Sequence, residues 1–448
     1  MVYLFIKSVI FITILWEIQI LTAETINSPT ACDSQKCLLP DCLCMDTAAP
    51  NGLNPEEIPQ MVFLTFDDAV ADVMYPTYQR ILHNRTNPNG CDIGMTLFVT
   101  HEGTNYRLVN QLFNKGNEIA SHTVTHKMDY DYWKNTSADF WLREVGYQRH
   151  LLHSYGNIPF DTIQGFRSPF LQTGGDATLT ALRMLGMSYD SSFTTMQVMD
   201  PPVWPFTMDY GAPHECPIPP CGNESHPGFW SIPMIEFRSS DNGFHCKTAD
   251  TCFPPYINRP DKPEASNLTA DEIFHYFVFN FNRFNKNRAP FGIHQHMYWF
   301  LNNEPILKGF LQFLDYLATL DYVYIVPLSK GIEWMKNPKT LKQLKDKDVF
   351  NCEASAAPCP KPQVCYYTKS VPGGARFMGS CVPCPAEYPW LPDQYDPLIT
   401  TTTRQTTPST TYSTVPNNSA SEPDINNLFL HLILIFQGLL LSFLHFFC

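Results

Sequence analysis

Between Met61 and about Pro338, short apolar runs alternate with longer stretches in which apolar residues recur every three or four positions. A short apolar run predicts a buried strand, and the three-to-four spacing predicts an amphipathic helix. Strands are expected at Met61–Phe66, Met95–Thr100, Ile163–Phe166, Met187–Tyr189, Trp230–Phe237, Phe291–His296 and Tyr322–Val326. Helices are expected at Tyr106–Lys115, Ala138–Ser154, Ala177–Leu185, Ala270–Arg283 and Pro305–Leu320. This alternation is typical of an α/β fold with a mainly parallel sheet.

The remaining segments predict what surrounds this region. Residues 24–57 form a short Cys-rich extension, and residues 201–263 are rich in Pro and Cys, which favours a large disulfide-bound insertion over regular elements. A second Cys-rich extension is expected at residues 339–390. Residues 391–420 are dense in Thr and Ser, as in an O-glycosylated stalk.

The two ends of the chain predict an exported protein. Residues 1–23 contain Lys7, an apolar stretch and then Ala23, which is the pattern of a secretory signal peptide. Residues 421–448 include Leu428–Cys448, which is mostly apolar and has no charged residue after it. Because small residues and a polar spacer precede it, this tail predicts a signal for a GPI anchor, with a membrane helix as the alternative. The expected location is the extracellular face of the plasma membrane.

Composition and cysteine count agree with export. The net charge of -13 with 30 Lys and Arg argues against nucleic acid as a partner. Of 15 cysteines, Cys448 lies in the apolar tail, which leaves an even number for disulfides. Cys91 stands alone and the last group, from Cys352 to Cys384, is odd in number, so a bridge from Cys91 to that group is expected. Zinc binding by the cysteines is the less favoured alternative.

Glycosylation sequons occur at Asn84, Asn135, Asn223, Asn267 and Asn417.

Candidate chemistry lies where the expected strands end, because ligands of β/α folds bind at the carboxyl ends of strands. Asp67 and Asp68 directly follow the first strand. Two adjacent carboxylates favour a nearby metal or other cation, although such a pair also starts loops and caps helices. His122 and His126 are spaced so that a helical turn would put both on one face, as two ligands of one zinc require.

A late strand carries two further histidines. His294 and His296 are two residues apart and therefore point to the same side of their strand. Either could face a site at the mouth of a barrel, and the alternative is a pair of surface histidines.

Taken together, the motifs resemble one family. Thr-Phe-Asp-Asp at 65–68, His-Thr-x-x-His at 122–126, Arg-Ser-Pro-Phe at 167–170, Asp-Ser-Ser-Phe at 190–193 and the late-strand histidine occur in the order seen in polysaccharide deacetylases. The chain resembles these carbohydrate esterases with the NodB homology domain, and specifically animal chitin deacetylases. The resemblance covers residues 58–338 and implies a distorted (β/α) barrel with a groove over the metal.

The resemblance also implies roles for the matching residues. Asp68, His122 and His126 would bind Zn²⁺ or another divalent metal, and Asp67 would be the catalytic base. His294 or His296 would be the catalytic acid.

Three protein ligands leave one position for water, which is typical of a catalytic zinc site. Arg167 would hold Asp67 as an ion pair, or would form a buried structural salt bridge. The backbone N–H of Phe170, where the family has Tyr, would stabilise the oxyanion. Asp190 would orient the acid, line the groove or cap a turn.

Two functions follow from this resemblance. The first is zinc-dependent removal of acetyl groups from an N-acetylglucosamine polymer, with release of acetate; chitin is the favoured polymer and another acetylated glycan is the alternative. The second is an extracellular carbohydrate-binding protein without turnover that organises a chitinous matrix. The intact metal and base motifs favour the enzyme. Possible sugar-stacking residues, for which core packing is the alternative, are Trp204, Tyr210, Trp230 and Trp299.

Overall fold

The computed structural model describes residues 31–195, 200–213, 216–241, 243–253, 268–301, 303–344, 349–352, 357–370 and 373–393. These residues belong to the first of two compact units, Met1–Thr400 and Thr401–Cys448. The predicted signal peptide, anchor signal and nearly all of the predicted stalk lie outside the described residues. In the described ranges, no helix is both long and apolar enough to cross a membrane.

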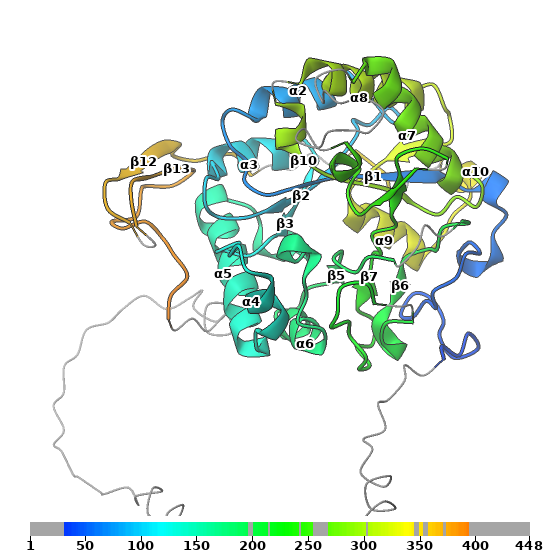
Figure 1. Cartoon of the computed structure of the whole chain (residues 1–448), viewed down its shortest axis with the longest axis horizontal. Coiled ribbons are helices and arrows are strands. Elements are labelled where there is room, and N and C mark those ends of the chain that lie inside the picture. Colours follow the sequence, from blue (N-terminus) through cyan, green and yellow to red (C-terminus); the bar gives the residue numbers. More distant parts are fainter. Residues whose placement is uncertain are drawn as a thin grey trace, which may run out of the picture. The chain divides into compact units, whose positions relative to one another are not determined.

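A nine-stranded sheet forms the centre of the fold, with β10, β1, β2, β3, β4, β5, β7 and β6 in order and β11 paired with β1 (Figure 1). Neighbouring strands run parallel, except that β6 is antiparallel to β7. The strands are β1 Gln60–Asp67, β2 Thr96–Val99, β3 Glu118–Ser121, β4 Gly165–Phe166, β5 Tyr189–Asp190, β6 Phe206–Thr207, β7 Trp230–Ser231, β10 Phe291–His296 and β11 Val323–Ile325. Every residue of β1 is buried, as expected for a parallel strand that is covered on both faces.

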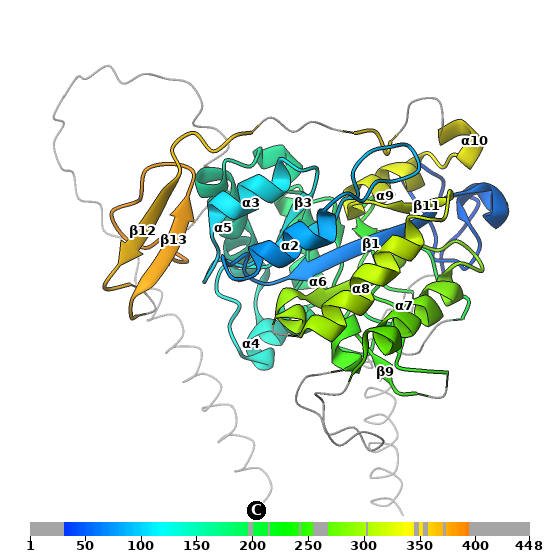
Figure 2. The same ribbon diagram turned by 90° about the horizontal axis from the view of Figure 1, so that it is seen from above.

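Helices lie around this curled sheet (Figure 2), so the predicted distorted barrel is confirmed. They are α2 Tyr75–Leu82, α3 Tyr106–Phe113, α4 Tyr130–Asn135, α5 Ala138–Gly156, α6 Asp176–Met184, α7 Ala270–Phe284, α8 Glu304–Leu317, α9 Leu328–Lys336 and α10 Leu341–Leu344. Local chemistry sets their ends. The Ser137 side chain caps the start of α5, and Asn157, at φ 52°, ends that helix in the left-handed region. Thr269 and Glu272 form a capping box at the start of α7.

The sequence pattern located most of these elements and missed some. The predicted strand Trp230–Phe237 is wrong in its middle: it is divided into β7 and β8, Phe237–Arg238, with Pro233 between them. Pro cannot donate to a strand ladder, which accounts for the break. Strand β3 was not predicted, because its run of Glu118, Ile119, Ala120 and Ser121 has only two apolar residues.

Seven disulfides join all fourteen cysteines that precede the apolar tail. The predicted bridge from Cys91 to the last group is confirmed, with Cys352 as its partner. Two more bridges, Cys359–Cys381 and Cys365–Cys384, hold the C-terminal hairpin. This hairpin consists of β12 Gln363–Tyr367 and β13 Arg376–Ser380, and a smaller one pairs β8 with β9 His245–Cys246. The alternative that the cysteines bind zinc is therefore wrong.

The Cys91–Cys352 bridge spans 261 residues of sequence. We expect the variant with Ser at both positions to lose about 4–5 kcal/mol of unfolding free energy, because closing a long loop restricts the unfolded chain most. The matched control replaces Cys37 and Cys42, which are five residues apart, and should lose about 2 kcal/mol. Denaturant unfolding measures both values. Equal losses would contradict the expectation.

Candidate active site

The predicted site residues come from the carboxyl ends of neighbouring parallel strands. β1 ends at Asp67, β3 is followed by His122, and β4 is followed by Arg167. On β10, His296 is the register partner of Asp67, and His294 lies two residues earlier. Since residues two apart on a strand share a face, this register gathers Asp67 and both histidines on one side of the β1–β10 pair.

Asp68, His122 and His126 form a cluster of possible metal ligands. Asp68 Oδ1 lies 3.3 Å from His126 Nε2 and 3.8 Å from His122 Nε2, and one ligand atom from each residue lies within 4.8 Å of the others. His122 Nδ1 donates to the carbonyl oxygen of Arg167 at 2.8 Å, which leaves the Nε2 lone pair free for the cluster. Burial lowers the pKa of His122 to about 4, so the imidazole is neutral, as a metal ligand must be.

The two histidines of this cluster lie on a tight loop. β3 ends at Ser121, and the backbone then turns with φ 68° at Thr123 and φ 40° at His126. The predicted helical turn is therefore wrong, because positive φ values are incompatible with a right-handed helix. The loop still brings the two imidazoles together, with ring centroids 4.9 Å apart. Asp68 also has a positive φ, 80°, so two of the three candidate ligands have a backbone conformation that is costly for residues other than glycine.

Glu144 of α5 holds this loop in place. Its Oε2 accepts hydrogen bonds from the backbone N–H groups of Val124 and Thr125, at 3.1 and 3.0 Å. Its Oε1 accepts from the Thr125 hydroxyl at 2.6 Å and from the Tyr132 hydroxyl at 3.1 Å. Glu144 is fully buried. These contacts offset the conformational cost of the loop between the two histidines.

Asp67 and Arg167 form a buried ion pair. Asp67 Oδ1 lies 2.6 Å from Arg167 Nη1, and both side chains are almost inaccessible to solvent. Burial alone would raise the pKa of Asp67, but the charge of Arg167, followed by His122 and His296, outweighs burial and lowers it. Asp67 is therefore ionised at neutral pH.

His296 has a carboxylate partner that the sequence motifs did not include. Its Nδ1 lies 2.7 Å from Asp250 Oδ2, and its backbone N–H donates to the same oxygen at 3.3 Å. Burial would lower the pKa of His296, but Asp250, with Asp67 and Asp68 contributing, raises it to about 9. The imidazole is thus protonated at neutral pH, and its side chain is 23% exposed.

Phe170 lies beside the candidate metal ligands, whereas Asp190 contacts Ser192. Phe170 has φ 54°, and its ring centroid lies 5.0 Å from that of His126, so this residue borders the cluster. Asp190 is buried, and its two oxygens accept from the backbone N–H and the hydroxyl of Ser192. Of its three predicted placements, the geometry matches a turn cap. Burial raises the pKa of Asp190 to about 6.

The possible stacking residues lie mostly in the core. Trp204, Trp230 and Trp299 are each 1% exposed, so they cannot stack on a polymer in this structure. Tyr210 is half-buried.

Comparisons with known proteins agree on one family. The family model for polysaccharide deacetylase matches residues 55–189. The chain is 34% identical over 365 residues to chitin deacetylase 8 of Bombyx mori, covering 81% of this chain and 92% of the relative. It is also 34% identical over 384 residues to chitin deacetylase 1 of Bombyx mori, covering 82% and 69%.

This chain belongs to the polysaccharide deacetylase family.

Among solved structures, a chitin deacetylase from Colletotrichum lindemuthianum matches with a TM-score of 0.33 and 12% identity, covering 60% of this chain and 84% of that one. A polysaccharide deacetylase from Bacillus cereus matches with a TM-score of 0.34 and 13% identity, covering 60% and 91%. The family consists of metal-dependent hydrolases, and this polysaccharide deacetylase contains an Asp/His/His group suited to a metal.

Two residues of this deacetylase that touch the site residues were missed in the sequence. Asp250 lies on a 3-10 turn, Ala249–Cys252, that is closed by the Cys246–Cys252 disulfide. Nothing in its spacing connects it with His296, 46 residues away. Glu144 left a weak signal, because it is an acidic residue between Trp141 and Val145 on the buried face of α5.

We expect Asp250→Asn to lower the pKa of His296 from about 9 toward its ordinary value, because the carboxylate that favours the imidazolium is lost. NMR titration of the histidine ring in chelator-treated protein measures this. Since the folded-state pKa is raised, the protonated ring stabilises the fold below about pH 6.5, and this contribution is lost as the pH rises through about 9. Asp190→Asn is the control and should leave the His296 titration in place. An unchanged titration in Asp250→Asn would rule out the assigned partner.

Proposed function

We propose that this polysaccharide deacetylase hydrolyses the N-acetyl groups of an N-acetylglucosamine polymer, chitin, and releases acetate in a zinc-dependent reaction. One observation supports this most: the three clustered ligands Asp68, His122 and His126 lie beside Asp67, a carboxylate that is not needed as a ligand. The two Bombyx mori relatives, both called chitin deacetylases, support the choice of polymer.

The donor set fits zinc. One carboxylate oxygen and two neutral imidazole nitrogens are ligands that zinc accepts, and three protein ligands are typical of its catalytic sites. When bound, such an ion acidifies water and polarises a carbonyl group. The Arg167 carbonyl fixes the ring of His122, and Thr123 Oγ1 accepts from the backbone N–H of His126 at 3.3 Å, so the protein orients one imidazole and holds the main chain of the other.

Asp67 is the proposed general base. Its Oδ1 is engaged by Arg167, which leaves Oδ2 to take the proton from the attacking water. The ion pair keeps Asp67 ionised and fixes its carboxylate plane. Asp67 directly precedes the ligand Asp68, so its position relative to the metal is set by one peptide unit.

His296, and not His294, is the proposed general acid. His296 is protonated at neutral pH, partly exposed, and next to Asp67 across the β1–β10 ladder. It can therefore give a proton to the amine as this group leaves the acetyl carbon. His294 is 1% exposed, and burial together with the charge of Arg167 lowers its pKa well below the ordinary value, so its ring is neutral at neutral pH and is not an acid that could protonate the amine.

Phe170 is the proposed oxyanion donor. A backbone N–H can stabilise negative charge on the carbonyl oxygen without a phenol, so the exchange of Tyr for Phe does not remove this function. The ring of Phe170 packs between His126 and Tyr130, at centroid distances of 5.0 and 4.9 Å, and this packing supports a fixed backbone at the edge of the cluster.

We propose an extracellular location with a GPI anchor. Seven disulfides favour an oxidising compartment. The anchor stays a prediction from the tail sequence.

Substitutions of the two adjacent acids should have different effects. We expect Asp67→Asn to keep bound zinc and to lower kcat by about 100- to 10,000-fold, the usual size of a general-base contribution. Asp68→Asn should lower zinc affinity itself, because a ligand is lost. Zinc content and acetate release measure the two effects, with the exposed Asp131→Asn as control. Full activity of Asp67→Asn would exclude this residue as the base.

Acetate release from N-acetylglucosamine oligomers of increasing length distinguishes the enzyme hypothesis from the hypothesis of a binding protein without turnover. We expect release from the native protein, its loss after chelation, and its return with added zinc. Binding of oligomers with no release at any length would instead support the carbohydrate-binding protein.

A further inference from the structure

His294 lies beneath the site, in contact with Arg167. Its Nδ1 atom is 3.0 Å from Arg167 Nη2 and 3.0 Å from Thr65 Oγ1. The imidazole is buried, so it can touch neither a polymer nor bulk water. Any effect of His294 on the reaction must therefore pass through the side chains that it contacts, such as Arg167 and Thr65.

The contact with His294 completes the hydrogen bonding of Arg167. A guanidinium has five N–H donors. Here Nε donates to the Ser191 carbonyl, Nη1 to Thr65 Oγ1 and Asp67 Oδ1, and Nη2 to Ser191 Oγ and His294 Nδ1. All five donors thus have an acceptor, and Asp67 is the acceptor that carries a charge. Without the His294 acceptor, one buried N–H of the Arg167 cation would have no partner. An unsatisfied hydrogen bond of a buried charged group costs more free energy than one of a neutral group.

The contact with Arg167 fixes the tautomer of the His294 ring. Because Arg167 is always a donor, Nδ1 must accept, and the proton of the neutral ring lies on Nε2. Burial and the adjacent guanidinium charge lower the pKa of His294 well below its ordinary value, which agrees with a neutral ring.

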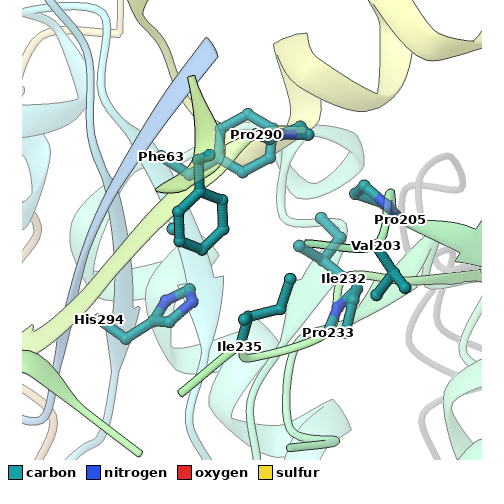
Figure 3. A pocket seen from close by; sticks show the side chains of 10 residues that line it. Phe63, Val203, Pro205, Ile232, Pro233, Ile235, Pro290 and His294 are labelled. Atoms are coloured by element: carbon teal, nitrogen blue, oxygen red, sulfur yellow. The ribbon is translucent and has the colours of Figure 1, made fainter. Parts of the chain in front are cut away.

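A glycine two residues earlier on β10 makes space for this ring. A Cβ atom on Gly292 would lie 2.4 Å from His294 Nε2 and 2.7 Å from its Cε1, so the glycine makes space for the imidazole. Figure 3 shows the ring beside a small cavity lined by Phe63, Ile235 and other apolar side chains. The β10 segment therefore holds the ring against Arg167.

We propose that His294 is a positioning residue: its neutral Nδ1 fixes the guanidinium of Arg167, and Arg167 in turn fixes the carboxylate of Asp67 for proton transfer. This role rests on the proposed function of Asp67 as the base. It differs from the role of catalytic acid, because His294 acts through two other side chains and never on the substrate.

The test compares His294→Leu with His294→Asn in the zinc-loaded full chain. Leu fills the space without an acceptor, whereas the Asn oxygen can take the place of Nδ1. We expect His294→Leu to lower kcat by about 10- to 100-fold with little change in KM and zinc content, since small misplacements of a reacting group cost this much. His294→Asn should keep kcat within about threefold of the native enzyme. Gly292→Ala, which displaces the ring, should behave like His294→Leu.

Two other outcomes would overturn the proposal. If His294 were the acid, His294→Asn would be as inactive as His294→Leu. If the residue were only structural, both variants would lose unfolding free energy while the folded, zinc-loaded fraction kept the native kcat.

A spectroscopic measurement tests the contact without requiring an active enzyme. In ¹⁵N spectra of histidine-labelled protein at pH 7, we expect one imidazole with a proton on Nε2 and none on Nδ1, whose Nδ1 signal moves in Arg167→Lys. Resonances of a cationic or Nδ1-protonated ring at this position would refute the contact. If acetate release is absent but this spectrum is seen, the proposed function fails while the contact stands.

Discussion

The buried ion pair between Arg167 and Asp67 is the interaction on which the rest of the site depends. A guanidinium without solvent is costly unless every donor is satisfied and its charge is matched. The chain meets both conditions by drawing acceptors from three strands: Thr65 and Asp67 on β1, Ser191 after β5, and His294 on β10, while Arg167 itself follows β4. The Arg167 carbonyl also accepts from His122, so the same residue directs a candidate metal ligand and the proposed base. The arrangement of the strands and the geometry of the site are thus coupled, because a shift of any one of these strands would leave a buried donor without its acceptor.

The sequence identified those parts of the fold that repeat a simple pattern. β1 is buried throughout and β10 is buried except at Gly292 and His296, and their bounds were predicted to within a residue or two. Asp67 and Asp68 were found because they stand at the end of a buried run, and His122 and His126 because their spacing suits two ligands of one metal. By contrast, the conformation of the His122–His126 loop was predicted wrongly. Spacing of four suits a helix, but the left-handed backbone at Thr123 depends on Glu144, a contact that no local pattern encodes.

The choice between His294 and His296 shows the same limit. Both lie on one face of one strand, and the sequence gives no reason to distinguish them. Their difference arises from neighbours distant in the chain: Arg167 beside His294, and Asp250 beside His296. A cation next to one imidazole and a carboxylate next to the other shift their pKa values in opposite directions. Two residues of one type thereby acquire opposite protonation states at neutral pH, because long-range contacts set the charge that each ring can carry.

The short disulfide-closed loop that contains Asp250 restrains the residue that sets the protonation of His296. Cys246 and Cys252 close a loop of a few residues, and the carboxylate that holds His296 protonated lies inside it. Without this bond, nothing covalent would confine Asp250 to the turn, and its effect on the pKa of His296 would be weaker. The disulfide thus limits how far the backbone of Asp250 can move away from His296, so a covalent bond as well as a hydrogen bond fixes the carboxylate that sets the charge of this ring.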